Sequence, residues 1–169
     1  MRFCQNHKIV HGVLPVAEFY EVSTNTNFTV PISMANFGHA TFILYEGVGT
    51  TGTATLTMQS CDNTTPDTQT AIAFDYAVMA PTAAVLAAGT ANDTYTNMGT
   101  ATTAGFATTA GSGHIYICEV DATGLYSTDQ YVRLLATELV DAAVLAGVLV
   151  ILSEPRMSGD CANWPAVLV

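Results

Sequence analysis

The N-terminal segment contains the residues whose types and spacing come closest to a metal site. Cys4, His7 and His11 are separated by two and by three residues, and a thiolate and two imidazoles at such short spacing can bind Zn²⁺. A tetrahedral site needs a fourth ligand, but no paired Cys or His motif follows in the chain. We therefore interpret the segment as an adhesive arm with incidental histidines, and we expect neither a metal nor a cofactor.

A glycine-rich stretch at residues 47–52 (Gly-Val-Gly-Thr-Thr-Gly) matches the pattern of dinucleotide-binding loops. In those loops the glycines lead into a helix whose N-terminus binds the pyrophosphate. Here the sequence Thr-Ala-Thr-Leu-Thr-Met follows, which is typical of a strand. The stretch therefore predicts a hairpin turn between two strands rather than a nucleotide site.

Two further histidines, His39 and His114, each follow a glycine at the start of a predicted strand. Either could act as a base beside a serine or an aspartate, but the chain has no Gly-x-Ser-x-Gly motif and no spacing typical of a catalytic triad. Carboxylates that could pair for glycoside hydrolysis are spread over turns and strand ends, which favours solvated charge. We therefore predict that the protein has no catalytic residues and is not an enzyme. These carboxylates are Glu46, Asp62, Asp75, Glu119, Asp121, Glu138 and Glu154.

The dominant pattern in the chain is alternation with a period of two. The 169 residues include 25 threonines, and Thr and Val favour strands over helices. Ala54, Leu56 and Met58 share one face of a strand whose other face carries threonines, which indicates one buried and one wet side. Short strands separated by turns predict an all-β, antiparallel, jelly-roll-like β-sandwich. The predicted strands are residues 28–34, 39–45, 53–61, 70–78, 114–120, 130–137 and 148–153.

Two segments do not follow the strand pattern. Residues 80–113 are rich in Ala, Thr and Gly, and a loop of this length in a compact domain is usually functional or disordered. An interaction loop anchored by Phe106 and a floppy insertion are both open alternatives. Residues 138–146 form a candidate crossover before the last strand.

The length is that of one domain. We divide the chain into an extended N-terminal arm, residues 1–16, and a single sandwich domain, residues 17–169, into which residues 80–113 are inserted. The apolar C-terminal tail contains the only tryptophan, Trp164. This tail is either a last edge strand or a plug into a neighbouring subunit, and both alternatives stay open.

The charge of the chain is sparse and one-sided. Four basic residues oppose 14 acidic ones, which gives a net charge of −10. Binding to nucleic acid needs clustered Lys and Arg, and anionic membranes repel an acidic surface, so we expect neither partner. The N-terminus lacks the apolar core of a signal peptide and no apolar run is long enough to span a bilayer. These features predict synthesis in the cytoplasm, where four buried or inert thiols are the default. Pairing of Cys4 with Cys161, which lie near opposite ends of the chain, stays an open alternative.

Three stretches of the chain resemble small virion proteins that are encoded near the head genes of tailed bacteriophages. They are residues 1–16 (MRFCQNHKIVHGVLPV), residues 36–63 (NFGHATFILYEGVGTTGTATLTMQSCDN) and residues 119–156 (EVDATGLYSTDQYVRLLATELVDAAVLAGVLVILSEPR). Related chains carry the same GVGxTGTxTLT hairpin, an acid-rich turn after a cysteine and a strand that ends in LSEPR. The resemblance covers most of the chain except residues 80–113. It implies a capsid decoration (cement) protein with a jelly-roll-like fold, bound to the outer surface of the virion head.

Such a protein binds the major capsid protein and also itself. A homotrimer at three-fold positions is the favoured arrangement, and a dimer that bridges capsomers is the alternative. The acidic balance suits a position outside the shell, away from packaged DNA. The residues expected at partner interfaces lie mainly in the arm, with one in the long loop and one in the tail. They are Arg2, Phe3, Lys8, Ile9, Val10, Val13, Leu14, Phe106 and Trp164.

Two other classes of function compete with this interpretation. A threonine-rich sandwich would serve equally well as a tail- or fibre-associated module that binds the host. A small glycan hydrolase would need a cleft with two close carboxylates. The position of the protein on the particle separates the first alternative from a decoration protein, and an activity assay separates the second.

Overall fold

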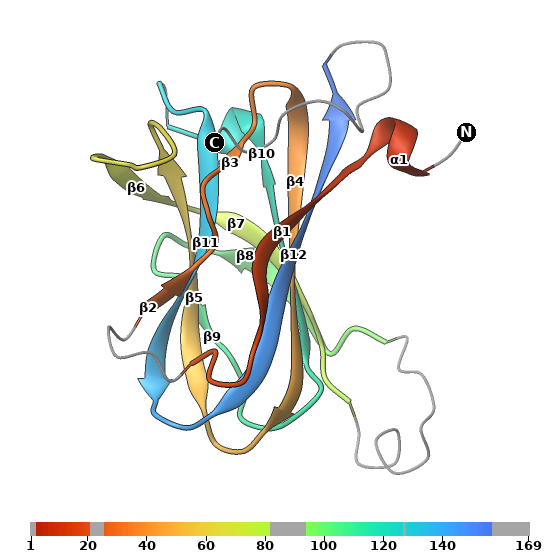
Figure 1. The fold of residues 1–169 in the computed structure, drawn as a ribbon, viewed down its shortest axis with the longest axis vertical. Helices are drawn as coiled ribbons and strands as arrows, with labels where there is room; N and C mark the ends of the chain where they lie inside the picture. The colour runs from red at the N-terminus through yellow and green to blue at the C-terminus, as the bar shows by residue number, and fades with distance from the viewer. Residues whose placement is uncertain (1–2, 21–25, 82–93, 127, 157–169) are drawn as a thin grey trace.

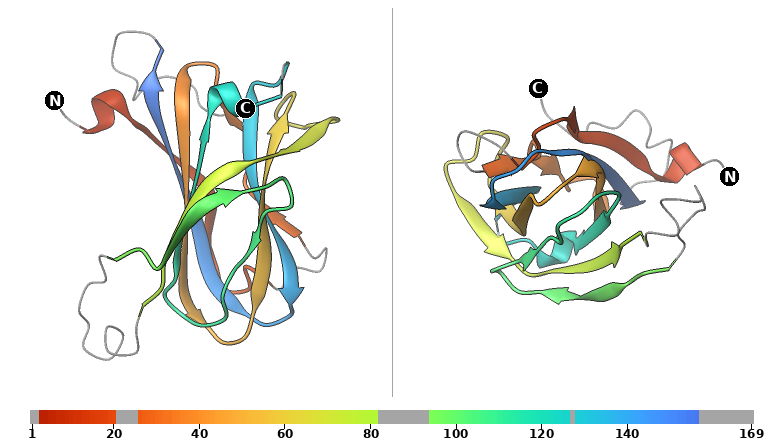
Figure 2. Two further views of the ribbon diagram at one scale, coloured as in Figure 1. Left: turned by 180° about the vertical axis from the view of Figure 1, so that it is seen from behind. Right: turned by 90° about the horizontal axis from the view of Figure 1, so that it is seen from below.

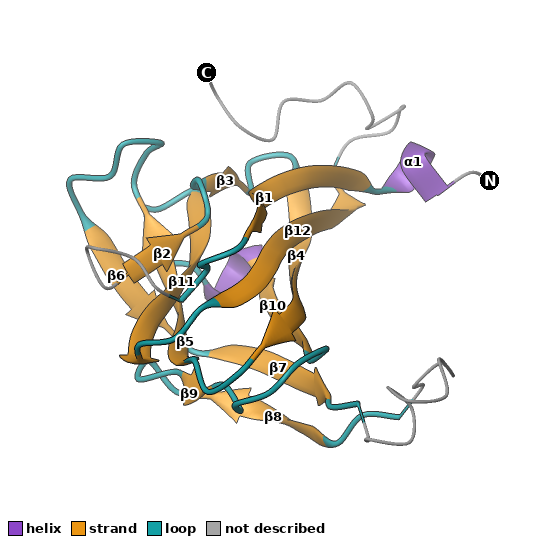
Figure 3. Ribbon diagram, turned by 60° about the horizontal axis from the view of Figure 1, so that its bottom comes forward, coloured by secondary structure: helices purple, strands orange, loops and turns teal. Residues whose placement is uncertain are grey.

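The protein folds into two antiparallel β-sheets that pack face to face (Figure 1). The computed structural model describes residues 3–20, 26–81, 94–126 and 128–156. In this part of the chain helix is confined to α1 (Phe3–Asn6) and the single turn η1 (Ala122–Gly124) (Figure 3). None of the described helices has the length or hydropathy needed to cross a bilayer. The predicted antiparallel all-β sandwich is confirmed.

The two sheets share the strands almost evenly. Sheet A has the order β1 (Lys8–Val16), β12 (Val144–Pro155), β4 (Phe37–Gly49), β10 (Ile115–Asp121), β7 (Phe74–Met79) and β8 (Asn97–Ala101). Sheet B has the order β2 (Thr26–Phe28), β11 (Tyr131–Val140), β5 (Thr53–Cys61) and β6 (Gln69–Ile72). Two short strands complete sheet B, namely β3 (Ile32–Ser33) on β11 and β9 (Phe106–Ala107) on β5.

The chain repeatedly crosses from one sheet to the other, so that both layers enclose one core (Figure 2). The predicted turn at residues 47–52 does join two strands, but β4 and β5 lie in opposite sheets and form no hydrogen-bonded hairpin. Gly52 lies against the link between β11 and β12, where an added Cβ would be 2.3 Å from the carbonyl oxygen of Ala142. Because the two links touch through their backbones, only glycine fits there.

The core is built from the inward residues of both sheets. Ala54, Leu56 and Met58 on β5 are fully buried, whereas the intervening threonines lie on the outer side. This confirms the faces predicted for that strand. The largest fully buried side chains come from both sheets and from the segment after β1, and include Tyr20, Tyr116, Phe37, Phe42, Ile32, Met34 and Leu44.

Part of the predicted N-terminal arm belongs to the sandwich body. Residues 8–16 form β1, which pairs with β12 from Lys8 opposite Leu152 to Val16 opposite Ala146. Val10 and Val13 pack against the core, so the alternating sequence completes the edge of sheet A. Of the described residues of the predicted arm, α1 and His7 precede this strand.

The segment predicted as one long loop also contains sheet. Within residues 80–113 the structure has β8, which pairs with β7, and β9, which pairs with β5. Asn97, Gly99 and Ala101 in β8 are residues that strands disfavour, and β9 has only two residues. Pairing with the neighbouring strand therefore orders both segments. Residues 82–93 lie outside the described residues.

The structure also changes the bounds of two other predicted segments. The strand predicted at residues 70–78 is two strands, β6 in sheet B and β7 in sheet A, with a bend at Ala73. The crossover predicted at residues 138–146 shrinks to residues 141–143, because β11 and β12 extend toward each other. This short link does cross between the sheets.

Candidate protein-docking surface

The outer face of sheet A, which is the face turned away from sheet B, carries two rows of apolar side chains. Cross-strand pairing places Leu149, Ile43, Ile117, Ala77 and Met98 in one row across five strands. At about 4.8 Å between strands this row spans roughly 19 Å. We call this row and its neighbouring row the apolar band, and the neighbouring row consists of Tyr45, Ile115 and Met79.

Three side chains of the apolar band are strongly exposed, and the other five are partly exposed. Met98 is 66%, Tyr45 59% and Leu149 46% exposed. Monomeric proteins rarely leave contiguous apolar surface of this kind in water, and such patches usually mark a site of protein association. The band is therefore the described surface best suited to contact another polypeptide.

A groove deepens the band beside the edge strand. It has a volume of about 420 Å³ and is lined by β1, β4 and β12. Tyr45, Leu145 and Leu149 form part of its lining, together with two glycines. A Cβ at Gly147 would come within 3.0 Å of the backbone nitrogen of Pro15, so a larger residue there would press against β1. The groove can accept an apolar side chain from a partner.

The other end of the same face is polar and acidic. His39 Nδ1 lies 2.7 Å from Asp121 Oδ1, and His39 Nε2 lies 3.4 Å from Glu119 Oε1. Asp75 stands directly opposite Glu119, which is an unfavourable pair of like charges. Partial burial opposes a charge on His39, but its hydrogen bonds to Asp121 and Glu119 outweigh burial and raise its pKa. We call these four residues the acidic end of sheet A.

A buried polar cluster lies between the sheets. Tyr20 donates a hydrogen bond of 2.6 Å to Glu46 Oε1, and His114 Nδ1 lies 3.2 Å from Glu46 Oε2 without hydrogen-bond alignment. Glu46 is 1% and His114 7% exposed. Burial raises the pKa of Glu46 to about 7 and lowers the pKa of His114. The neutral forms of both groups are therefore favoured, as expected for a cluster enclosed in a core.

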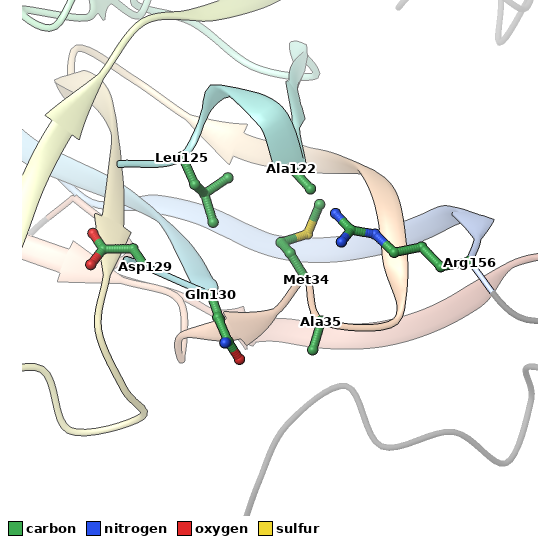
Figure 4. Close-up of a pocket in the computed structure, with 7 residues that line it drawn as sticks. All are labelled: Met34, Ala35, Ala122, Leu125, Asp129, Gln130 and Arg156. Carbon is green, nitrogen blue, oxygen red and sulfur yellow. The ribbon is translucent and has the colours of Figure 1, made fainter. Parts of the chain in front are cut away.

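A second recess lies at the end of the sandwich where β12 finishes (Figure 4). Its volume is about 220 Å³. Arg156 reaches toward Met34 on one side, and Asp129 lies across the recess beside Leu125 (Figure 4). The Asp129 carboxylate accepts a hydrogen bond from Ser60. None of the seven lining residues carries a hydroxyl, thiol or imidazole, and they are Met34, Ala35, Ala122, Leu125, Asp129, Gln130 and Arg156.

The structure distributes the predicted interface residues over different surroundings. Ile9 and Leu14 are exposed on β1, at 51% and 65%, and Phe3 is exposed with its ring stacked on His7 at 4.3 Å between centroids. Lys8 begins β1. Val10 and Val13 instead pack on the core, although Val13 also lines the groove.

Phe106 is likewise an internal anchor, because its ring stacks on Tyr76 at 4.2 Å between centroids. Arg2 and Trp164 lie outside the described residues. The apolar band was not predicted from the sequence. Its signal is a lack of alternation in the runs FILY at residues 42–45 and VLVIL at residues 148–152, which place apolar residues on both faces of a strand.

The remaining reactive side chains form no further site in the described chain. Within it, no group of three His, Cys, Asp or Glu side chains is placed to hold a metal ion. Cys61 and Cys118 are buried free thiols, as predicted. Burial raises the pKa of Cys61 to about 11 and raises that of Cys118 as well, so both buried thiols stay protonated at neutral pH. Comparison of the chain with family models, curated proteins and solved structures gave no match.

Proposed function

We propose that the protein is a non-enzymatic virion protein of a tailed bacteriophage, a capsid decoration protein that binds the outer surface of the head. The observation that supports the proposal is the apolar band on sheet A. A row of apolar side chains across five strands, exposed at Leu149 and Met98 and partly exposed between them, suits a broad contact with a protein surface. The likeness of the sequence to small virion proteins gives the class of partner, the major capsid protein.

The charge of the chain supports a position outside the shell. A net charge of −10 with only four basic residues opposes contact with packaged DNA. On the outer face of sheet A, the acidic end lies next to the apolar band, which contains no charged residue. A matching capsid surface would therefore be apolar at its centre and basic at one margin, because complementary charge at the rim guides association.

The strand order supports a jelly roll as the finer class of fold. In sheet A, β1, β12, β4 and β10 are hydrogen-bonded neighbours in that sequence. In sheet B, the corresponding neighbours are β2, β11, β5 and β6. In chain order β1, β2, β4 and β5 alternate between the two sheets, and so do β10, β11 and β12, which is typical of a jelly roll. Such a body of two packed sheets is stiff enough to hold two neighbouring capsomers in fixed positions.

The test of the proposal is binding to phage heads that lack the protein. Leu149→Asp and Tyr45→Asp each place a charge in the apolar band, and either change should weaken binding by about 10-fold or more. Tyr126→Asp is the matched control, since Tyr126 is 61% exposed in the link before β11. Occupancy of heads by each purified variant is measured by sedimentation. Failure of the wild-type protein to bind heads, or equal binding by all variants, would refute the proposal.

A second candidate is a tail- or fibre-associated module that binds the host. The end recess favours it, because Asp129, Gln130 and Arg156 offer hydrogen-bonding groups to a small polar ligand. Microscopy of particles with a labelled protein separates the two candidates. Even coverage of the head supports decoration, and a signal at the tail supports the alternative.

A further inference from the structure

The two edges of sheet A differ in how they are protected. At one edge, β1 carries Lys8 and Pro15 and has two register shifts against β12. Charged residues, proline and irregular pairing are the usual means by which proteins prevent an edge strand from pairing with another chain. The β1 edge is therefore poorly suited to further strand pairing.

The opposite edge, β8, has none of these features. It pairs residue by residue with β7, from Asn97 opposite Val78 to Ala101 opposite Phe74, without a register shift. Residues 97–100 are exposed, and the other side of β8 pairs with no strand of the described chain. Its sequence, Asn-Met-Gly-Thr-Ala, contains no charged residue and no proline. Within the described chain, no strand pairs with the backbone groups along this side, so they can pair with another strand.

The distribution of charge in the chain indicates which kind of strand can pair with β8. Two chains of net charge −10 repel each other, and the repulsion is weakest where the contact itself carries no charge, because screening reduces the interaction between distant charges. No charged residue occurs between Thr94 and Ala107. Among the described residues, Asp75 on the neighbouring strand β7 accepts a hydrogen bond of 2.6 Å from Thr100 on the outer face rather than projecting past the edge. At the β8 edge, two copies of the chain can therefore approach each other without bringing like charges face to face.

We propose that β8 pairs antiparallel with β8 of a second copy of this chain. Antiparallel pairing of identical strands is two-fold symmetric, so the contact closes at a dimer and uses the β8 edge of both copies. Two six-stranded sheets then become one continuous sheet. The apolar row ends on β8 at Met98, so the bands of both copies meet at the two-fold axis.

The inference concerns self-association and stands apart from the proposed binding to capsids. A dimer would present two apolar bands side by side, and two linked contacts bind a surface more tightly than one. The sequence analysis favours a trimer and keeps a dimer as the alternative, and the β8 edge supports the dimer.

The test uses the purified full chain in the absence of phage particles. Light scattering after size exclusion should give twice the mass of one chain. Met98→Lys should raise the dissociation constant of the dimer by about 10-fold or more, because it places two like charges at the axis. Leu14→Lys is the matched control on the protected edge, since Leu14 is 65% and Met98 66% exposed, and it should leave the dimer intact.

Hydrogen exchange of the wild-type chain provides a second measurement that needs no variant. Backbone amides of residues 97–101 should exchange more slowly at high protein concentration than at low concentration. A wild-type chain that stays monomeric, or a dimer whose β8 amides exchange equally at both concentrations, overturns the proposal. If Met98→Lys does not fold, the exchange result alone decides. Loss of capsid binding by a chain that still dimerises would refute the proposed function and leave this inference standing.

Discussion

At the scale of single residues, the buried carboxyl of Glu46 makes stability depend on pH. Its pKa in the folded protein is about 7, against a usual value of 4.5, because burial disfavours its charge. Because the folded protein binds this proton more tightly than the unfolded chain, protonated Glu46 contributes fully to stability below pH 4.5. The contribution is lost as the pH rises through about 7. A shift of this size corresponds to at most about 3 kcal/mol.

Glu46→Gln should therefore remove a pH-dependent loss of stability. The amide oxygen can still accept the hydrogen bond from Tyr20, and no charge forms in the core at high pH. We expect the variant to unfold at higher urea than the wild type at pH 8, by about 2 kcal/mol, and to differ little at pH 4.5. Urea unfolding at both pH values measures this.

Two comparisons make that experiment specific. His114 has a lowered pKa, so its stabilisation is lost as pH falls below about 6.5, and only the difference between variant and wild type isolates Glu46. Glu138→Gln is the control, since Glu138 lies on β11 near the end of the strand and outside the buried cluster. A Glu46→Gln variant that is no more stable than the wild type at pH 8 would contradict the account of the cluster.

At the scale of elements, one glycine fixes the short strand β9 on sheet B. Gly105 has φ +73°, and a Cβ there would lie 1.9 Å from the carbonyl oxygen of Leu56. The turn at this glycine brings Phe106 onto Tyr76. Both the conformation and the close approach require glycine.

Gly105→Ala should destabilise the fold by about 3 kcal/mol, because strain and a backbone clash add. Gly124→Ala is the control, since its new Cβ would make only an ordinary contact of 3.7 Å with Val120. Thermal unfolding followed by circular dichroism compares the two variants. Equal melting temperatures would show that the turn at Gly105 adapts without cost.

The sequence predicted strands well where one face is buried and the other is wet. The strand at residues 53–61 was predicted with its observed bounds, because alternation reports which side chains face the core. Alternation does not report which sheet a strand joins. The predicted strand at residues 70–78 therefore gave no sign of its division between two sheets at Ala73, where neither glycine nor proline marks the bend.

The candidate site was harder to predict than the fold. The sequence predicts most interface residues in the N-terminal segment. Val10 and Val13 instead complete the core, because β1 pairs with the edge of β12. The apolar band is assembled from five strands that are distant in sequence. Only the cross-strand register brings Leu149 and Met98 into one row, and register follows from tertiary pairing rather than from local sequence.

At the scale of the whole molecule, the distribution of charge and apolar surface divides the described chain into distinct regions. Sheet A carries the apolar band and the acidic end on one face, while the outer side of β5 in sheet B carries threonines. An apolar patch bounded by charge is typical of a protein that meets its partner in one orientation. The central claim is therefore that the outer face of sheet A is the contact with the head.

The most direct measurement of that claim is a reconstruction of phage heads, at side-chain resolution, with the protein bound. We expect the protein on the outer surface of the shell, with Leu149 and Tyr45 in contact with the major capsid protein and the threonines of β5 facing solvent. Density for the protein only at the tail, or a head-bound protein whose sheet A faces solvent, would contradict the account.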